Sequence, residues 1–275
     1  MTLPCSSPES ASHGSLAGAP AVSPRGAASP RAIGGAAAAF RVLESRIVSC
    51  ERCPRLRSYC AEIARTRRRA YRDWQYWGKP VPSFGDPEAR VLALGLAPGA
   101  HGSNRTGRPF TGDGSGNFLY PVLHAAGFAS QPLAASRDDG MRLDDLRITS
   151  VLRCAPPGNK PLPTELQNCA TFVDEEIALL PDLRVVVCLG KIAFDGYVAH
   201  LLRTKKIVRR GELVFAHGAE YSLDRQPHIL AAYHPSLQNT NTGLLTRAML
   251  QAVFERARAL AAHPLSASRE GRHRS

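Results

Sequence analysis

The sequence lacks any run of about 18 consecutive apolar residues, which is the length that a membrane-spanning helix requires. Its N-terminus also lacks a basic segment followed by an apolar core, the pattern of a secretory signal. We therefore expect a cytoplasmic protein without a membrane partner. Acidic residues are in deficit, because 23 Asp and Glu stand against 35 Lys and Arg, which leaves a formal net charge of +12 at pH 7.

This excess of positive charge favours a polyanionic partner, because contacts with phosphate groups dominate the affinity of proteins for nucleic acids. A solvated basic surface with basic chain ends is the alternative, since several of the charges lie in residues 268–275. On charge alone, nucleic acid is the better-supported interpretation.

Cysteines are few, and their odd number and uneven spacing argue against a disulfide scaffold. Of the seven, Cys50 and Cys53 are separated by two residues, which suits two ligands of one metal ion or cluster. The spacing alone leaves zinc, a redox pair and an iron–sulfur cluster open, with Cys60 as a further candidate ligand. Cys188 lies in an apolar run and is interpreted as a buried thiol, and Cys5 lies in the N-terminal tail.

Large apolar residues are nearly absent from residues 1–38, which are rich in Ala, Gly, Ser and Pro. Such a segment cannot bury enough surface to offset the entropy of ordering it, so we expect a disordered tail. Residues 39–263 are expected to form one domain, and residues 264–275 a basic flexible tail.

Strand-like and helix-like segments alternate within this domain. Short apolar runs bounded by charge, Gly or Pro predict four strands, at residues 90–97, 146–154, 183–190 and 228–236. Amphipathic stretches between and around them predict helices, at residues 40–50, 117–127, 163–180, 191–202 and 243–262. The alternation predicts a three-layer α/β domain with a parallel sheet covered on both faces.

Ligands of open α/β sheets bind beyond the carboxyl ends of the strands, so the loop after each strand is a candidate binding segment. A glycine-rich loop, "GLAPGAHGSNRTGRPFTGDGSG" at residues 95–116, comes after the first strand. It is not a P-loop, because it has no Gly-Lys-Ser/Thr, and its glycine spacing is wrong for a dinucleotide fingerprint. After the fourth strand, Pro235 fixes the backbone beside His234, whose neutral imidazole can donate a hydrogen bond to developing negative charge.

These pieces together resemble a known family. The stretch "YWGKPVPSFGDPEARVLALGLAPGAHGSNRTGRPFTGDGSG", then "ITSVLRCAPPGNKPLP" and "YHPSLQNTNTG", framed by Cys50 and Cys53, is similar to the bacterial and archaeal iron–sulfur uracil-DNA glycosylases. The "GLAP" motif and its continuation resemble the family 5, or type b, branch. The resemblance spans about residues 45 to 260.

The resemblance implies a three-layer α/β/α uracil-DNA glycosylase-like fold with a four-stranded parallel sheet. It implies a monofunctional DNA repair enzyme, without lyase activity, that hydrolyses the N-glycosidic bond of a deaminated base and leaves an abasic site for base excision repair. It also implies a structural 4Fe-4S cluster that takes no part in the chemistry, with four ligands by motif position: Cys50, Cys53, Cys154 and Cys169.

A base must be flipped out of DNA before such an enzyme can reach it. Phe110 matches the stacking aromatic of the family, and His234 matches the donor to the departing base. Glycines let backbone approach an extruded nucleotide closely. The resemblance thus predicts a set of base-binding residues: Gly95, Ala97, Pro98, Gly99, Phe110, Ser150 and His234.

Two departures from the related family 4 concern the catalytic and base-reading positions. Leu96 replaces its acidic residue, so we expect Asp113, the only carboxylate of the glycine-rich loop, to act on water or the sugar, with Asn104 as the polar second choice. Ser150 replaces its base-reading Asn, and a hydroxyl group reads a base edge less strictly than an amide. The pocket is therefore expected to accept hypoxanthine, xanthine or other modified bases besides uracil.

DNA contacts are expected in the loop after the histidine motif, which resembles the intercalating loop of the family, at Ser236, Gln238, Asn239 and Asn241. Residues 64–77 mix arginines with aromatics, and either track the DNA backbone or form a solvated helix face. We expect a monomer, associated with the nucleoid, that acts on double-stranded DNA, with single-stranded DNA as a second candidate substrate. A non-catalytic, zinc- or cluster-stabilised nucleic-acid-binding protein and a hydrolase of free nucleosides or nucleotides are the alternatives.

Overall fold

The computed structural model describes residues 30–265, with side chains from residue 35 onward. Residues 1–29 and 266–275, which make up most of the two predicted tails, lie outside the described residues. The first helix, α1 (Pro30–Val48), begins well before the predicted domain boundary at residue 38, so that boundary falls inside a helix. Its run of alanines and the two glycines before it carry no large apolar residue, which is why sequence patterning placed the start of the helix later.

A sheet with the strand order β1-β3-β2-β4-β6-β5 forms the centre of the molecule. Its four inner strands, each within a predicted run, are parallel: β2 (Val91–Gly95), β3 (Leu146–Ser150), β4 (Val185–Leu189) and β6 (His228–Ala232). The predicted four-stranded parallel sheet is therefore present. Two short antiparallel edge strands, β1 (Phe84–Gly85) and β5 (Glu220–Tyr221), extend it beyond the prediction.

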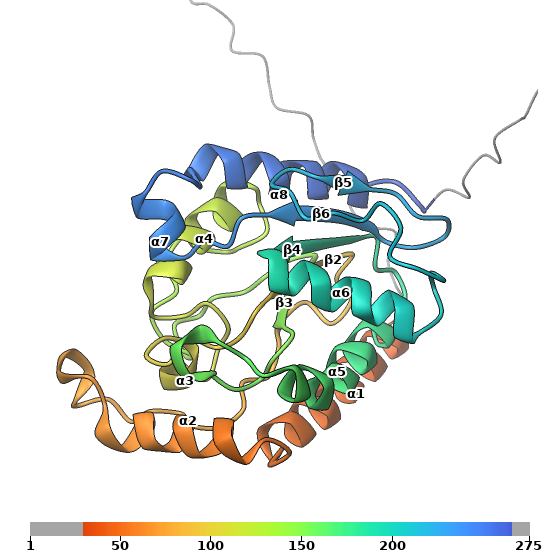
Figure 1. Cartoon of the computed structure of the whole chain (residues 1–275). Helices are drawn as coiled ribbons and strands as arrows, with labels where there is room; N and C mark the ends of the chain where they lie inside the picture. Colours follow the sequence, from red (N-terminus) through yellow and green to blue (C-terminus); the bar gives the residue numbers. More distant parts are fainter. Residues whose placement is uncertain (1–29, 266–275) are drawn as a thin grey trace, which may run out of the picture.

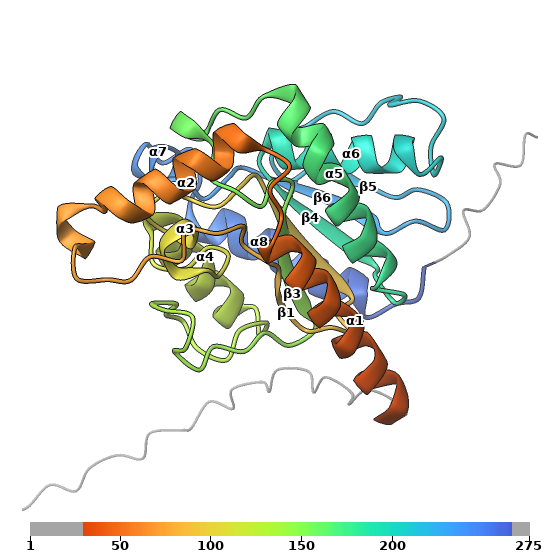
Figure 2. The same ribbon diagram turned by 90° about the horizontal axis from the view of Figure 1, so that it is seen from below.

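Helices cover both faces of the sheet, which explains why its inner strands are apolar without alternation. Helices α4 (Gly114–Ala125) and α8 (Arg247–Ala261) pack on one face, against Val91, Ala93 and their neighbours. On the other face, α6 (Lys191–Arg203) packs against Leu92 and Leu94, and α5 (Pro163–Ala178) and α1 lie beside it. Figures 1 and 2 show the two helical layers on opposite sides of the strands.

The remaining elements are short, or carry too few apolar residues for patterning to find them. Helix α2 (Pro54–Thr66) starts with a proline, which suits the first turn of a helix, and buries only Leu56 and Cys60. The others are α3 (Ser103–Thr106), α7 (Leu237–Asn241) and the 3₁₀ turns η1 (Arg69–Tyr71) and η2 (Pro157–Asn159). Among the described residues, every helix is too short or too polar to cross a membrane.

Candidate active site

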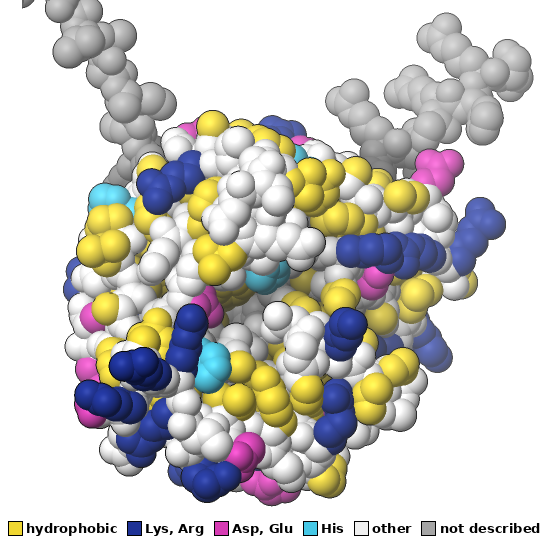
Figure 3. All heavy atoms as spheres, turned by 60° about the vertical axis from the view of Figure 1, so that its left-hand side comes forward, with side chains coloured by type: hydrophobic (Ala, Val, Ile, Leu, Met, Phe, Trp, Pro, Cys, Tyr) yellow, Lys and Arg dark blue, Asp and Glu magenta, His cyan; other side chains and the backbone are white. Residues whose placement is uncertain are grey.

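A pocket of about 680 Å³ lies beyond the carboxyl ends of the parallel strands. Its walls come mainly from three segments that are far apart in the sequence: the glycine-rich loop (residues 96–103 and 109–115), residues 150–159 and residues 234–238. Tyr59, Val81 and Pro82 complete the lining. Figure 3 shows it as a hollow in the surface, with a histidine side chain inside it. The strand-end rule therefore predicts the place of the cavity correctly, because parallel strands bring the loops after them to one edge.

Phe110 forms one wall of the pocket, and the backbone around it is arranged to hold its ring. The residue is 8% exposed, and its φ of 50° lies in the left-handed region, which is rare for a bulky side chain. Gly95 ends β2 beneath the ring, where an added β-carbon would lie 3.0 Å from Cζ of Phe110 and 3.4 Å from Oγ of Ser150. A side chain at this position would push the Phe110 ring by a few tenths of an ångström, so glycine lets the ring keep its place. Gly95 does not itself line the cavity.

His234 faces Phe110 from the turn after β6. The two ring centroids are 5.8 Å apart with an interplanar angle of 32°. Asn239 Nδ2 donates to the carbonyl oxygen of His234 at 2.8 Å, and the Ser236 backbone N–H donates to the same oxygen at 2.8 Å. Burial lowers the pKa of the imidazole to about 4, so the ring is neutral at pH 7 and can act as a hydrogen-bond donor.

Asp113 lies on the same side of the pocket as Phe110 and caps α4. Its Oδ1 accepts a hydrogen bond from the Gly116 backbone N–H at 3.0 Å. Its Oδ2 lies against the loop backbone, since an added β-carbon at Gly99 would be 2.8 Å from it, and one at Gly102 would overlap it. Burial raises the pKa of this carboxyl, because the charged form has lost water, and only neighbouring backbone N–H groups and Arg105 oppose that effect.

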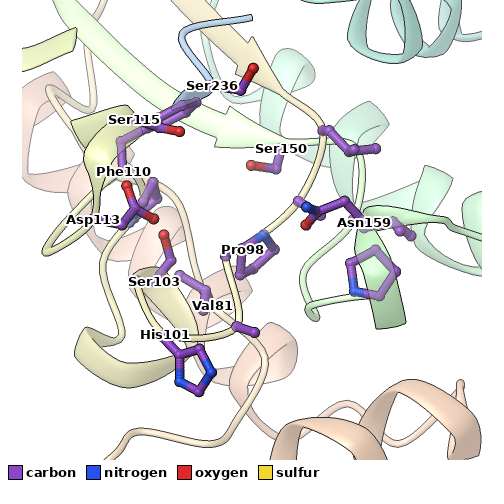
Figure 4. Close-up of a pocket in the computed structure, with 18 of the residues that line it drawn as sticks. Val81, Pro98, His101, Ser103, Phe110, Asp113, Ser115, Ser150, Asn159 and Ser236 are labelled. Atoms are coloured by element: carbon purple, nitrogen blue, oxygen red, sulfur yellow. The ribbon is translucent and has the colours of Figure 1, made fainter. Parts of the chain in front are cut away.

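The opposite wall carries Ser150 and Asn159, as Figure 4 shows. Ser150 is the last residue of β3. Asn159 is the last residue of η2, and its φ of 56° is a strained backbone conformation that sets the direction of its side chain. Asn159, His101 and Ser103 also line the pocket, and sequence reasoning did not select them. The strand-end rule could have found Asn159, because "CAPPGNKPLP" comes directly after the second strand.

Most of the sequence-predicted residues meet at this pocket. Those that line it are Ala97, Pro98, Gly99, Phe110, Asp113, Ser150, His234, Ser236 and Gln238. Asn239 stands behind it and braces the His234 turn, and Asn241 is exposed at the end of α7.

Asn104 requires a correction, because it does not line the pocket. Its side chain is 1% exposed, and its Nδ2 donates to the carbonyl oxygens of Cys60 and Ala100, both at 3.3 Å. The helical turn of α3 directs the side chain towards α2 instead of the cavity. Asn104 therefore braces the glycine-rich loop and does not face the cavity.

The four predicted cysteine ligands gather in one cluster between α1, α2, α5 and the end of β3. Cys154 and Cys169 are buried, and Cys50 and Cys53 are partly exposed beside them. The fifth thiol of this cluster, Cys60, donates to the carbonyl oxygen of Ala155 at 3.7 Å. Its interaction with Cys154 lowers the pKa of Cys60 and raises the pKa of Cys154.

The donor set suits an iron–sulfur cluster in kind, since thiolates are its usual ligands. Within residues 35–265, however, no three ligand-type side chains are arranged to hold a metal ion. Among the described residues, the structure thus shows the thiols assembled, without three of them converging on the position of a single metal ion.

Comparisons with known proteins agree with this architecture. The model of the uracil DNA glycosylase superfamily matches residues 82–258. A "Type-5 uracil-DNA glycosylase" of Thermus thermophilus is 52% identical over 215 residues, which cover 78% of this chain and 95% of that protein. One of Mycobacterium bovis is 44% identical over 230 residues, covering 83% and 84%. A "Type-4 uracil-DNA glycosylase" of Archaeoglobus fulgidus is 30% identical over 168 residues, covering 57% and 70%.

Proposed function

The chain belongs to the uracil-DNA glycosylase superfamily, and from that premise we propose that it removes uracil from DNA by hydrolysing the N-glycosidic bond. The observation that carries the proposal is the pair formed by Phe110 and His234, whose ring centroids are 5.8 Å apart in a pocket large enough for a base. An aromatic face and a neutral donor side by side suit an extruded base, which stacks on one and accepts a hydrogen bond from the other.

The base leaves with the electron pair of the bond between its nitrogen and C1′, so negative charge develops on its ring and carbonyl oxygens. His234 is the donor that stabilises this charge, and its low pKa keeps the imidazole neutral at pH 7. The turn that Asn239 and Ser236 brace holds the ring in place, so little reorganisation is required as the bond breaks.

The sugar becomes cationic as the base departs, and water then adds its oxygen to C1′ and releases a proton. Asp113 supplies a carboxylate that can stabilise the sugar cation or accept the proton from the water. Burial leaves its charge poorly solvated and therefore responsive to a nearby cation. Asn159, on the opposite wall, offers an amide that can orient the water. Both roles are part of the proposal.

We extend the proposal to hypoxanthine, xanthine and other modified bases because Ser150 stands where a stricter reader would be expected. A hydroxyl group donates or accepts as required, so it tolerates different base edges. Replacing Ser150 by Asn is expected to narrow the range towards uracil.

Further proposals concern the cofactor, partner and location. The gathered thiols of Cys50, Cys53, Cys154 and Cys169 support a structural 4Fe-4S cluster, which would cross-link segments distant in the sequence. We propose that the protein acts as a monomer on double-stranded DNA, and also on single strands, in the cytoplasm at the nucleoid.

A glycosylase assay tests this function. Labelled duplexes with uracil, hypoxanthine or hydroxymethyluracil opposite guanine are incubated with the chain, and abasic sites are cleaved with alkali. Excision of uracil that falls at least about 100-fold in His234→Ala, as expected for loss of a preorganised donor, supports the proposal. Absence of excision by a folded, iron-replete preparation would reject it in favour of a non-catalytic nucleic-acid-binding protein.

A further inference from the structure

The segment of residues 67–77, here called the arginine arm, lies beside the pocket. It comes after α2, whose last turn is closed by Arg67 with a left-handed φ of 53°. Nη1 of Arg67 donates to the carbonyl oxygen of Arg72 at 2.6 Å, which closes the arm into a compact loop. Apart from the single turn η1, the arm is irregular, so its shape depends on what holds it from outside.

The glycine-rich loop holds the arm in place through Arg105. The guanidinium carbon of this buried residue lies 3.9 Å from the ring centroid of Tyr71 and 4.1 Å from that of Trp74. Its Nε donates to the carbonyl oxygen of His101 at 2.8 Å, and its Nη2 donates to that of Gly112 at 2.6 Å. The aromatic residues of the arm therefore clamp a side chain that also braces the wall of the pocket.

Backbone hydrogen bonds complete the attachment. Trp77 N–H donates to the carbonyl oxygen of Arg105 at 2.9 Å, and Gly78 N–H donates to that of Asn104 at 3.0 Å. Tyr76 Oη lies 3.1 Å from Nδ1 of His101, a residue that lines the pocket. The arm is thus fixed relative to the pocket, and so are the charges that it carries.

Three of the arginines of the arm are exposed and lack a close acidic partner. Neither the Arg68 nor the Arg69 guanidinium has a hydrogen bond or an ion pair to any residue among 35–265. Arg72 is exposed too, with only a 3.8 Å contact to Asp73, the one acidic residue of the arm. Exposed pairs of this kind contribute little to stability, so these arginines are available for an external anion.

The arm also lies close enough to the pocket to affect it electrostatically. The pKa of His101 is lowered by burial first and then by the positive charges of Arg68 and Arg105. Figure 3 shows Lys and Arg side chains gathered on one side of the hollow, next to a histidine.

We propose that Arg68, Arg69 and Arg72 bind the phosphate backbone of the DNA strand that carries the extruded base. This inference rests on the proposed function and adds the surface that holds the substrate. Arginine suits phosphate because its planar guanidinium donates two parallel hydrogen bonds. Extrusion also requires the flanking backbone to be held, since unstacking a base costs a few kcal/mol.

The test is the salt dependence of binding, with R68A/R69A/R72A as the variant. The matched control, R142A/K206A/R209A, removes three exposed cations from residues that do not line the pocket. Binding to a fluorescent duplex that contains a tetrahydrofuran abasic analogue is measured by anisotropy at several salt concentrations. In a plot of the logarithm of the association constant against the logarithm of salt concentration, each phosphate contact contributes about −0.9 to the slope. The slope of the arm variant is therefore expected to be less negative than that of the wild type by about 2 to 3.

A charge-retaining variant, R68K/R69K/R72K, is expected to keep most of the slope. Unchanged slope in the alanine variant, or an equal loss in the control, overturns the inference. Excision of uracil by the wild-type chain is measured in parallel. Its absence would reject the proposed function and leave the salt slopes as a separate result on the arm.

Discussion

At the scale of single residues, the missing side chain of Gly95 leaves space for the Phe110 ring, which forms one wall of the pocket. Replacing Gly95 by Ala would put a β-carbon 3.0 Å from Phe110 Cζ, so the ring must give by a few tenths of an ångström. A displacement of about 1 Å at a reacting centre can reduce the rate about 100-fold, so this smaller shift is expected to cost less. We expect Gly95→Ala to lower kcat/KM for uracil excision several-fold, roughly 3- to 10-fold, measured by single-turnover and steady-state assays.

The control for this substitution is Gly35→Ala in α1. An added β-carbon at Gly35 meets no atom within 4 Å, and alanine is favoured over glycine inside a helix. Excision by Gly35→Ala should match that of the wild type. Wild-type activity in Gly95→Ala would contradict the idea that Phe110 must keep this position.

The lowered pKa of His234 predicts how the stability of the protein depends on pH. The pKa of this residue is about 6.5 in an unfolded chain and about 4 in the folded protein, where burial disfavours the charged ring. Between these values the unfolded state binds a proton that the folded state does not. The His234 contribution to stability is therefore fully present above pH 6.5 and falls as the pH drops to about 4.

Two measurements check this expectation. NMR titration of the His234 ring, assigned by its absence in His234→Ala, should show no protonation midpoint between pH 5.5 and 7.5, roughly the window around an ordinary histidine. Urea unfolding at a mildly acidic and a neutral pH should differ less in His234→Ala than in the wild type. A ring that titrates near its ordinary pKa would show that the pocket does not desolvate it.

At the scale of elements, sequence patterning located the parts that have a strong physical signal. The four inner strands are buried on both faces, so each appears as an uninterrupted apolar run such as Val185–Leu189. Helices α2 and α7 have no such signal. The first buries two residues only, and the second is five residues long and is positioned by the Ser236 cap.

The site was predictable where a motif names the residue, and less so where folding decides the direction of a side chain. Phe110 and His234 match motif positions, and both line the pocket. Asp113 and Asn104 are candidates by residue type within the glycine-rich loop; Asp113 lines the pocket, but α3 turns Asn104 towards Cys60. Asn159 was missed because its place opposite Asp113 depends on how two loops fold around the sheet edge.

Helix α7 supports a prediction about duplex DNA through its first residue. Leu237 is 56% exposed and lines the pocket beside Gly114, where it can occupy the gap that an extruded base leaves. We expect Leu237→Ala to slow excision from duplexes roughly 10- to 100-fold, because burying a leucine side chain is worth about 1.5–3 kcal/mol. Excision from single strands, which have no stack to replace, should change little.

Leu244 is the matched control, since it is 49% exposed but does not line the pocket. Leu245, by contrast, is 1% exposed and belongs to the core, so its substitution would test folding instead. Rates for Leu237→Ala and Leu244→Ala on matched single-strand and duplex substrates decide the question. Equal losses on both substrates would mean that Leu237 shapes the pocket and does not replace a base.

At the scale of the whole molecule, the cysteines connect parts that are far apart in the chain. Cys50 and Cys53 lie between α1 and α2, Cys154 comes after β3, and Cys169 lies within α5. A cluster bound by all four would close long loops and so reduce the entropy of the unfolded chain. Substitution of a ligand should therefore lower both the iron content and the melting temperature.

Cys169→Ser is the variant to measure, with Cys188→Ala and Cys60→Ser as controls. Cys188 is fully buried in β4, away from the other thiols, so its substitution affects packing but should leave the iron content unchanged. Cys60 lies within the thiol cluster but outside the proposed ligand set. Retained iron and acid-labile sulfide in Cys60→Ser, with loss in Cys169→Ser, would fit the assignment. Loss in Cys60→Ser, with iron retained in Cys169→Ser, would contradict the assignment and make Cys60 a ligand in place of Cys169.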